Sequence, residues 1–483
     1  MSDLGIYVAV PFCQTKCTYC NFHTGVVAAE RFGPYVEAVC EEIQGHAAVY
    51  AAAGIIDDAE GFSRPRGREK PAETIPQGLK PSNGKGLQPE LELWETDSRM
   101  AEGIAAGDEK EVREVDTVYF GGGTPSLLEA RDLGKILEAI QATFRIAGER
   151  GSRSGGSPYI RGRAVGKISE VTLEADPETV TGEKAAAWVA AGINRVSFGV
   201  QSFVDKELVA AGRMHRREDI YRAVPILRAA GITNISFDLI AGLAWQTRES
   251  WKESLDALVE MGPEHVSVYL LEVDEGSRLG AEILRGGEKY GAGQVPAEDV
   301  MVEFYDVARE KLRAAGYGQY EISNWAKAGK KSRHNLKYWR RQEYLGFGAG
   351  AHSFLGNWRW ANAHDASKYV GLLSGSVEAK SGPGGISLPV FPMAASAHRE
   401  GRLPVEQLEK ITAAKALEEE LFLGLRQLEG IDLERIEKQY GVTLAPKFDP
   451  LVASGWLRRE GGVVRLAEER LSVSNEVFVE LMK

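Results

Sequence analysis

The stretch that decides the fold of this chain is Tyr7-Val-Ala-Val-Pro-Phe-Cys-Gln-Thr-Lys-Cys-Thr-Tyr-Cys20, with cysteines at positions 13, 17 and 20. A 4Fe–4S cube has four irons, and a loop with the spacing C-x3-C-x2-C supplies three thiolates. One iron is therefore left without a protein ligand and is open to a small molecule. The spacing predicts a cluster of this kind near the amino end.

Two other uses of these cysteines are open. A zinc site needs four ligands, for which His23 is a candidate, and a disulfide framework needs an even count and a secreted context. The fourth cysteine, Cys40, lies in an amphipathic helical pattern over 35–43, where cysteine is usually a small core residue. We expect the three clustered cysteines to bind the cube, in the manner of radical S-adenosylmethionine (SAM) chemistry, and Cys40 to pack in the core.

Composition restricts the class of protein. The chain has 483 residues, of which 43% are hydrophobic and 26% charged, which favours one large folded domain plus a smaller one. The beginning of the chain lacks a basic stretch followed by an apolar one, and few cysteines fit a reducing compartment, so we expect a cytoplasmic protein. The net charge of −11 opposes nucleic-acid binding, although the segment 330–342 holds six basic side chains and no acidic one. A local anionic ligand is expected there.

Short apolar runs alternate with helical patterns over the first two thirds of the chain, which is typical of a parallel sheet. The expected strands are 4–10, 115–120, 168–175, 194–200, 234–241 and 265–271. The expected helices between them are 31–53, 128–145, 181–191, 217–230 and 247–261. This order predicts a partial (β/α)6 TIM-like barrel over residues 1–345.

The rest of the chain divides by composition. Residues 54–112 and 147–166 are rich in Gly, Pro, Ser, Lys and Glu, and we expect them to be surface insertions. Residues 346–398 are expected to be a connecting segment that ends in a Gly/Ser/Pro-rich linker. In residues 399–483, short helices followed by a hairpin predict a small α+β winged-helix-like domain, without the basic face that DNA binding needs.

Polar residues recur where the expected strands end. The glycine run Gly121-Gly-Gly-Thr-Pro125 follows the second strand and allows the backbone to approach a ligand closely. Glu174 closes the third strand, Gln201 follows the fourth, Asp238 lies within the fifth and Glu272 closes the sixth. Because barrels place their sites at the carboxyl ends of the strands, we expect these groups to share one site.

Ordered motifs along the chain carry a family resemblance. They are the cysteine loop, Gly121-Gly-Gly-Thr-Pro, Leu173-Glu-Ala-Asp-Pro, Gly192-Ile-Asn-Arg-Val-Ser-Phe-Gly-Val-Gln-Ser-Phe, Gly212-Arg-Met-His, Phe237-Asp-Leu-Ile-Ala-Gly-Leu, Tyr320-Glu-Ile-Ser-Asn and Leu345-Gly-Phe-Gly-Ala-Gly-Ala-His-Ser. Together they resemble the oxygen-independent coproporphyrinogen III oxidase-like radical SAM family and, within it, the haem-chaperone branch.

The resemblance implies a set of cofactor residues. Cys13, Cys17 and Cys20 would ligate the 4Fe–4S cluster, and SAM would close the open iron through its amino and carboxylate groups. The positions that match the family's SAM site are Tyr7, Tyr19, Gly122, Gly123, Thr124, Glu174, Gln201, Arg213 and Asp238. The chemistry agrees, since carboxylates suit the amino and ribose hydroxyl groups and an arginine suits a carboxylate.

Departures from the family separate its branches. The oxidases carry a further cysteine where this chain has Phe22 and a substantial extension before the cluster loop, and both differences favour the chaperone branch. Compared with the usual chaperone pattern, Ala9 replaces a histidine, Asn21 an aspartate, and Ala244-Trp245 a Pro-Gly pair. The loss of the histidine weakens any proton-transfer role at that position.

A haem-binding segment is also implied. His334-Asn-Leu-Lys-Tyr338 matches the H-N-x-x-Y pattern proposed for haem in the chaperone branch, so His334, Asn335 and Tyr338 are the candidates. Imidazole and tyrosine both serve as axial ligands of haem iron, and the neighbouring basic residues suit the propionates. His352 is the competing candidate for the axial ligand.

The resemblance therefore implies a haem chaperone that passes haem to acceptor haemoproteins, which include acceptors at the membrane surface, with SAM cleavage secondary or absent. The alternative is a true enzyme, either an oxygen-independent coproporphyrinogen III oxidase or another radical SAM enzyme such as a methyltransferase. No residue is assigned a catalytic role. Peripheral membrane association and a homodimer are also considered, whereas the identity of the acceptor and the role of the insertions stay open.

Overall fold

The structure is a computed structural model and describes residues 3–22, 24–52, 114–147, 168–374, 391–392, 400–401 and 404–482. The expected insertions lie outside the described residues apart from residue 147, and so does most of the expected linker.

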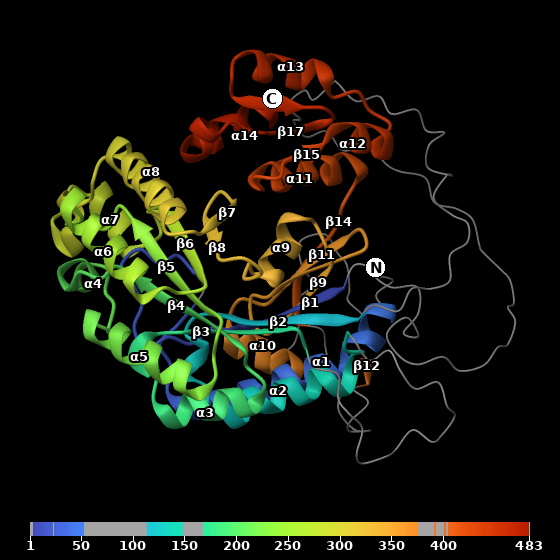
Figure 1. Cartoon of the computed structure of the whole chain (residues 1–483). Coiled ribbons are helices and arrows are strands. Elements are labelled where there is room, and N and C mark those ends of the chain that lie inside the picture. Colours follow the sequence, from blue (N-terminus) through green and yellow to red (C-terminus); the bar gives the residue numbers. More distant parts are fainter. Residues whose placement is uncertain are drawn as a thin grey trace, which may run out of the picture.

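A parallel sheet in chain order forms the centre of the molecule (Figure 1). Its strands are β1 (Leu4–Val10), β2 (Val115–Gly122), β3 (Glu170–Ala175), β4 (Arg195–Gln201), β5 (Ile235–Ala241) and β6 (His265–Leu270). Each pairs in parallel with the next, as the period of the sequence predicts. Their inward and outward side chains are both largely buried, which explains their near-continuous apolar sequences.

The sheet continues beyond these strands on both sides. On one side it adds β9 (Tyr344–Phe347), β10 (His352–Leu355), β11 (Trp358–Asn362) and β14 (Val405–Lys410), and on the other β8 (Asn324–Ala326) and β7 (Gly318–Glu321). β9 is parallel to β1, whereas the outer pairs are antiparallel. A separate two-stranded pair joins β12 (Phe391–Pro392) to β13 (Glu400–Gly401).

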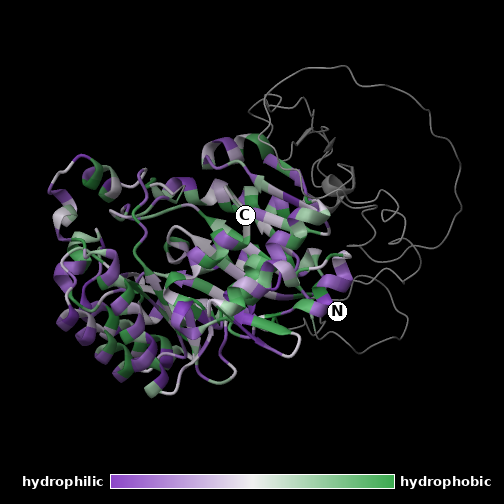
Figure 2. Cartoon of the chain, turned by 90° about the horizontal axis from the view of Figure 1, so that it is seen from above, coloured by the Kyte–Doolittle hydropathy of each residue, from purple (hydrophilic) through white to green (hydrophobic). Residues whose placement is uncertain are grey.

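Helices cover the outer face of the sheet, and Figure 2 shows polar and apolar residues alternating along them. They are α1 (Phe32–Ala52), α2 (Ala130–Thr143), α3 (Gly182–Ala191), α4 (Asp205–Ala210), α5 (Arg217–Ala230), α6 (Arg248–Met261), α7 (Arg278–Leu284), α8 (Glu298–Ala314) and α10 (Ala366–Leu373). Thr181 caps α3 at its start, and Gly192, with φ of 108°, ends it. One continuous apolar core joins α1, α2, α3, α5, α6, α8 and α10 to the sheet, whereas Leu279 of α7 belongs to a second, smaller apolar cluster.

A small module at the carboxyl end lies over one end of the barrel (Figure 1). It consists of α11 (Ala413–Arg426), β15 (Ile431–Asp432), α12 (Leu433–Tyr440), α13 (Ala445–Ala453), β16 (Leu457–Glu460), β17 (Val463–Leu466) and α14 (Ser474–Met482). Its strands form a sheet in the order β15-β17-β16. The order of helices followed by a hairpin confirms the expected winged-helix-like arrangement.

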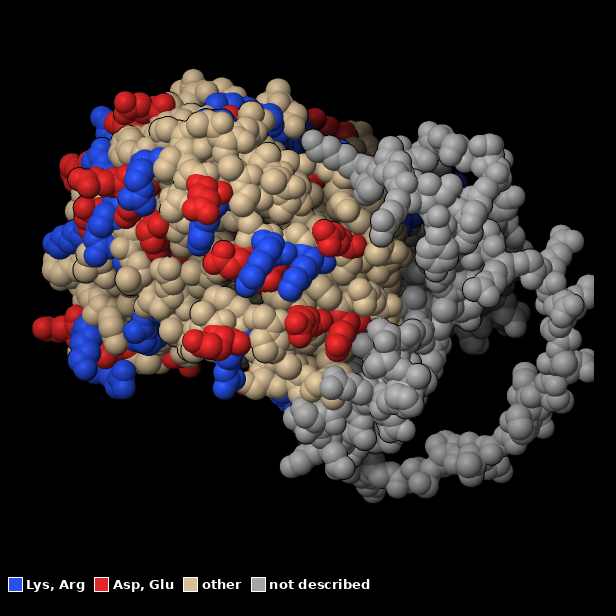
Figure 3. Space-filling model, turned by 90° about the horizontal axis from the view of Figure 1, so that it is seen from below, with Lys and Arg blue, Asp and Glu red and all other residues tan. Residues whose placement is uncertain are grey.

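Charges of both signs are interspersed on the face that Figure 3 shows, where no large patch of one sign stands out. Across the described part of the chain, no helix combines the length and the apolar character that a membrane crossing requires.

Candidate cofactor and ligand-binding site

The cluster loop, residues 13–20, is fixed by backbone hydrogen bonds to distant elements. Thr18 N–H donates to Ala211 O at 3.0 Å, just after α4, and Thr18 O accepts from Leu279 N–H of α7 at 2.8 Å. Cys13 N–H donates to Gly25 O at 3.0 Å. The three cysteine side chains are half-buried and line one cavity of about 640 Å³.

The donor set of this loop fits a cube. All four cysteines are free thiols, and Cys40 packs against the core from α1, as the sequence predicts. Within the described ranges no three His, Cys, Asp or Glu side chains converge on the position of a single metal ion. A cube does not need such convergence, because each thiolate binds a different iron. His23, the candidate fourth ligand of a zinc site, lies outside the described residues.

The glycine run after β2 lies against the cluster loop. A side chain at Gly123 would collide with the carbonyl oxygen of Phe12, so only glycine allows the two segments to pack here. Gly122 has φ of 114°, and its N–H donates to Glu174 Oε2 at 3.1 Å. The backbone of this run thereby links the cysteine loop to the end of β3.

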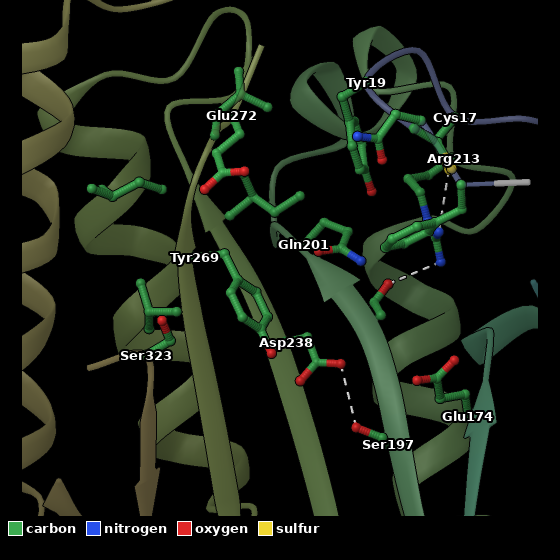
Figure 4. A pocket seen from close by; sticks show the side chains of 18 of the residues that line it. Cys17, Tyr19, Glu174, Ser197, Gln201, Arg213, Asp238, Tyr269, Glu272 and Ser323 are labelled. Carbon is green, nitrogen blue, oxygen red and sulfur yellow. Dashed lines mark hydrogen bonds between the residues drawn. The ribbon is translucent and has the colours of Figure 1, made fainter. Parts of the chain in front are cut away.

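Two carboxylates reach the same cavity from β3 and β5, the strands on either side of β4 (Figure 4). Glu174 accepts from Tyr119 O–H at 2.9 Å, and Asp238 accepts from Ser197 O–H at 3.3 Å. Burial raises the pKa of Glu174 to about 7 and raises the pKa of Asp238 as well. Removing water in this way strengthens the attraction between an ionised carboxylate and a bound cation.

Arg213 joins the cluster loop to the strand ends. Its guanidinium donates to Cys17 Sγ at 3.4 Å, to Gly199 O at 3.0 Å and to the carboxylate of Asp176. Asp176 also accepts from Thr124 O–H at 3.1 Å, so it orients two residues that the family resemblance places at SAM. Asp176 was not among the predicted site residues, although it belongs to the Leu173-Glu-Ala-Asp-Pro motif.

Most of the predicted SAM residues line this cavity. Tyr19, Gly122, Gly123, Thr124, Glu174, Gln201, Arg213 and Asp238 do so together with Glu272. Gln201 has φ of 62°, a strained value that occurs preferentially at binding sites. The ring of Tyr7 lies beneath the run and stacks on Tyr119, with ring centroids 6.0 Å apart.

The haem candidates on α9 (Arg333–Trp339) point in different directions. His334 is fully buried, its Nδ1 lies 3.0 Å from Thr117 Oγ1, and its Nε2 lies 2.9 Å from Tyr338 Oη. Burial lowers the pKa of His334 to about 3, so its ring is neutral. Of the three candidates, only Asn335 lines the cavity.

The basic residues of this segment already have partners, contrary to the expectation of a free anion-binding patch. Lys337 Nζ lies 2.7 Å from Asp116 Oδ1, and Arg333 donates to Asp116 Oδ2 at 2.8 Å. The other four contact backbone or carboxylate oxygens: Lys330 at Thr233, Lys331 and Arg340 at Glu429, and Arg341 at Glu419. Three carboxylates that are distant in the sequence, Asp116, Glu419 and Glu429, thus pair with five of the six cations.

Two further sequence-predicted positions lie away from this cavity. His352 is exposed on β10, and partial desolvation of its ring, together with the nearby His364 and Arg359, lowers its pKa. Trp245, at the position of the usual glycine, has φ of 72°, and Lys206 Nζ lies 3.5 Å from the centroid of its ring. The turn thus keeps a glycine-like backbone with a tryptophan in it.

Comparisons with known proteins agree with this architecture. Residues 91–271 match the model of the Radical SAM superfamily, and residues 411–475 match that of the HemN C-terminal domain. The protein named heme chaperone HemW of Synechocystis sp. (strain ATCC 27184 / PCC 6803 / Kazusa) is 30% identical over 369 residues, which cover 75% of this chain and 69% of that protein. The chain belongs to the heme chaperone HemW family. The HemW of Bacillus subtilis (strain 168) is 28% identical over 476 residues, 98% of this chain and 97% of that protein.

A solved structure shares the fold of this HemW family member along almost its whole length. It is the coproporphyrinogen III oxidase HemN from Escherichia coli, described as a radical SAM enzyme. The TM-score is 0.67 at 17% identity, and the match covers 99% of this chain and 90% of that chain. The radical SAM fold expected from the sequence is therefore confirmed.

Proposed function

We propose that this chain binds haem and transfers it to an acceptor haemoprotein, and that it carries a 4Fe–4S cluster and SAM. One observation supports this above all: a single cavity connects the three cysteines, the strand ends and Asn335 of α9. The cofactor residues and one member of the proposed haem segment thus face the same space. Membership of the HemW family supports the same assignment.

Cys13, Cys17 and Cys20 would hold the cluster, whose open iron would take the amino and carboxylate groups of SAM. Glu174 and Asp238 supply negative charge on the sheet side, and Arg213, next to Cys17, supplies positive charge. Cluster and SAM together would supply one-electron chemistry, or would stabilise the conformation of the protein that binds haem. The residues of this chain bind and orient these groups.

Haem would lie at the end of the cavity that Asn335 lines. For His334 to act as an axial ligand, its Nε2 must exchange the contact with Tyr338 for the iron, because both ring nitrogens are engaged within the protein. His352 needs no such exchange, since its ring is exposed. The two histidines therefore make different demands on the structure.

The experiment combines anaerobic cluster reconstitution, hemin titration and an assay for 5′-deoxyadenosine on one sample. We expect a shift of the Soret band that saturates with hemin, with little or no 5′-deoxyadenosine. No spectral change with the wild type would contradict haem binding. The formation of 5′-deoxyadenosine together with protoporphyrinogen IX from coproporphyrinogen III would instead establish the oxidase.

A further inference from the structure

One part of the cavity, here called the outer lobe, is lined by residues other than those proposed for the cluster and SAM. It lies between the barrel and the carboxyl-terminal module and is lined by Asn335, Trp339, Arg426, Ser472, Ser474 and Asn475. We propose that this outer lobe binds the carboxylate of a flat tetrapyrrole, with Arg426 as the main anion-binding side chain. The inference deepens the proposed haem function and depends on it for the identity of the ligand.

Arg426 is held firmly at the junction of the two parts of the molecule. Its carbonyl oxygen accepts from Ile322 N–H at 3.1 Å, and Leu428 N–H donates to Tyr320 O at 3.2 Å, so the end of α11 pairs with the edge of the barrel. Gln427 Nε2 donates to Trp339 O at 3.1 Å and ties the same segment to α9. A side chain held in this way loses little freedom when a ligand binds.

The polar groups of Arg426 and Trp339 are not used within the described part of the protein. The guanidinium of Arg426 lies over the Trp339 ring, 4.8 Å from its centroid, and forms no ion pair or hydrogen bond with a described residue. Arg426 Nε and Trp339 Nε1 are both buried without a hydrogen-bond partner. A buried donor without a partner is costly, and a missing ligand is one reason for its presence.

Glu321 is a buried acid that interacts electrostatically with Arg426 but does not form an ion pair with it in the described part of the protein. Glu321 is fully buried, and its carboxylate accepts a hydrogen bond from Asn324. Burial raises the pKa of Glu321 although Arg426 opposes the shift. This differs from α9, where every basic side chain has an oxygen partner, and it leaves Arg426 with its charge available.

The surroundings favour a carboxylate with a flat aromatic body. A guanidinium binds a carboxylate through two parallel hydrogen bonds, and the indole ring offers an apolar face beside it. Ser474 and Asn475 are the first residues of α14, and the amino end of a helix favours an anion. A haem propionate and a propionate of an iron-free porphyrin share this chemistry.

The test measures binding of hemin, hemin dimethyl ester and coproporphyrin III to the wild type, Arg426→Gln and Arg470→Gln. Arg470 is the matched control, because it also lies over a tryptophan of the same module, 5.4 Å from the centroid of Trp456, but does not line the cavity. We expect Arg426→Gln to weaken hemin and coproporphyrin III by roughly tenfold to a hundredfold, the usual range for a lost charge-assisted hydrogen bond. Binding of the diester should stay unchanged, and Arg470→Gln should match the wild type.

Several results would overturn the inference. Equal weakening of the diacid and the diester would show that Arg426 acts by packing alone, and unaltered diacid binding would show that it does not meet the carboxylate. If the wild type binds coproporphyrin III with the expected dependence on Arg426 but does not bind hemin, the haem proposal fails and the carboxylate site stands. Unchanged thermal midpoints and SAM affinity of Arg426→Gln check that the variant is folded.

Discussion

The cluster loop and helix α9 both carry ligand motifs, yet the structure treats them in opposite ways. The thiols of the cluster loop face a cavity while the loop backbone is fixed from outside. On α9, His334 and Tyr338 bond to each other, and Lys337 and Arg333 both pair with Asp116. The comparison teaches that a motif marks a binding site only where its donor atoms face free space. The same rule points away from His334 and toward Arg426.

The largest effect is expected at the cluster loop. Cys17→Ser removes one of three thiolates, so reconstituted protein should retain almost no iron or sulfide, since the remaining two ligands do not hold the cube. Cys40→Ser is the control, because Cys40 packs against the core from α1. Iron and sulfide analysis after anaerobic reconstitution measures both. Full iron content in the Cys17 variant would show that Cys17 is not a cluster ligand, and the contrast between the cluster loop and α9 would no longer hold.

Next in size is the effect of His334→Ala on stability. The ring is fully buried and engages Thr117 and Tyr338, so its loss should lower the free energy of unfolding by about 2–4 kcal/mol. His352→Ala removes an exposed ring and should change stability by less than about 0.5 kcal/mol. Chemical denaturation and hemin titration of both variants separate structure from ligation. A stable His334 variant that has lost its Soret shift would establish His334 as the ligand after all.

A smaller effect is expected for SAM binding through Glu174. Glu174→Gln removes the charge that would attract the SAM amino group, and we expect affinity to fall roughly tenfold to a hundredfold. Because the pKa of Glu174 is raised to about 7, the wild type should also lose affinity as the pH falls from 8 to 6. Glu178→Gln, which lines the same cavity but is not among the predicted SAM residues, is the control. Calorimetric titration that shows the same pH profile in Glu174→Gln would contradict this role.

The smallest effect concerns Glu42, which has hydrogen-bond partners similar to those of Glu174 but does not line the cavity. Both accept from a tyrosine hydroxyl and a glycine N–H, but Glu42 also accepts from Asn362 and is sealed in the core. Burial raises its pKa to about 7. A raised pKa adds stability at low pH that is lost as the pH rises through about 7, by about 1–2 kcal/mol between pH 5.5 and 7.5. Glu42→Gln should unfold with a weaker pH dependence, and an unchanged slope would assign the effect to another group.

Much of the barrel was predictable from the sequence because local pattern determines it. Apolar runs at fixed spacing predicted the strands β1 to β6, and polar residues such as Glu174 near the end of β3 and Asp238 within β5 do meet in one cavity. Both signals are local, since a parallel strand buried on two faces is apolar along its length. The winged-helix-like module followed from the same kind of pattern.

The contacts of α9 could not be predicted, because the residues that it contacts are distant in the sequence. Glu170 on β3 accepts from the backbone N–H groups of Arg333 and His334, and Asp116 on β2 binds two of the cations. A basic run read alone looks like an open anion site, and only the fold shows that carboxylates cover it. Arg426 was missed for the same reason, since a lone arginine at a helix end carries no sequence signal.

The turn at Trp245 places a tryptophan at a positive φ, a backbone conformation that glycine adopts most easily. A tryptophan with φ of 72° costs about 1–2 kcal/mol relative to glycine. Two hydrogen bonds hold the turn: Trp245 N–H donates to Gln294 O at 2.9 Å, and Gly242 N–H donates to Gln246 Oε1. The strained position is therefore stabilised by the neighbouring residues Gln246 and Gln294 rather than by Trp245 itself.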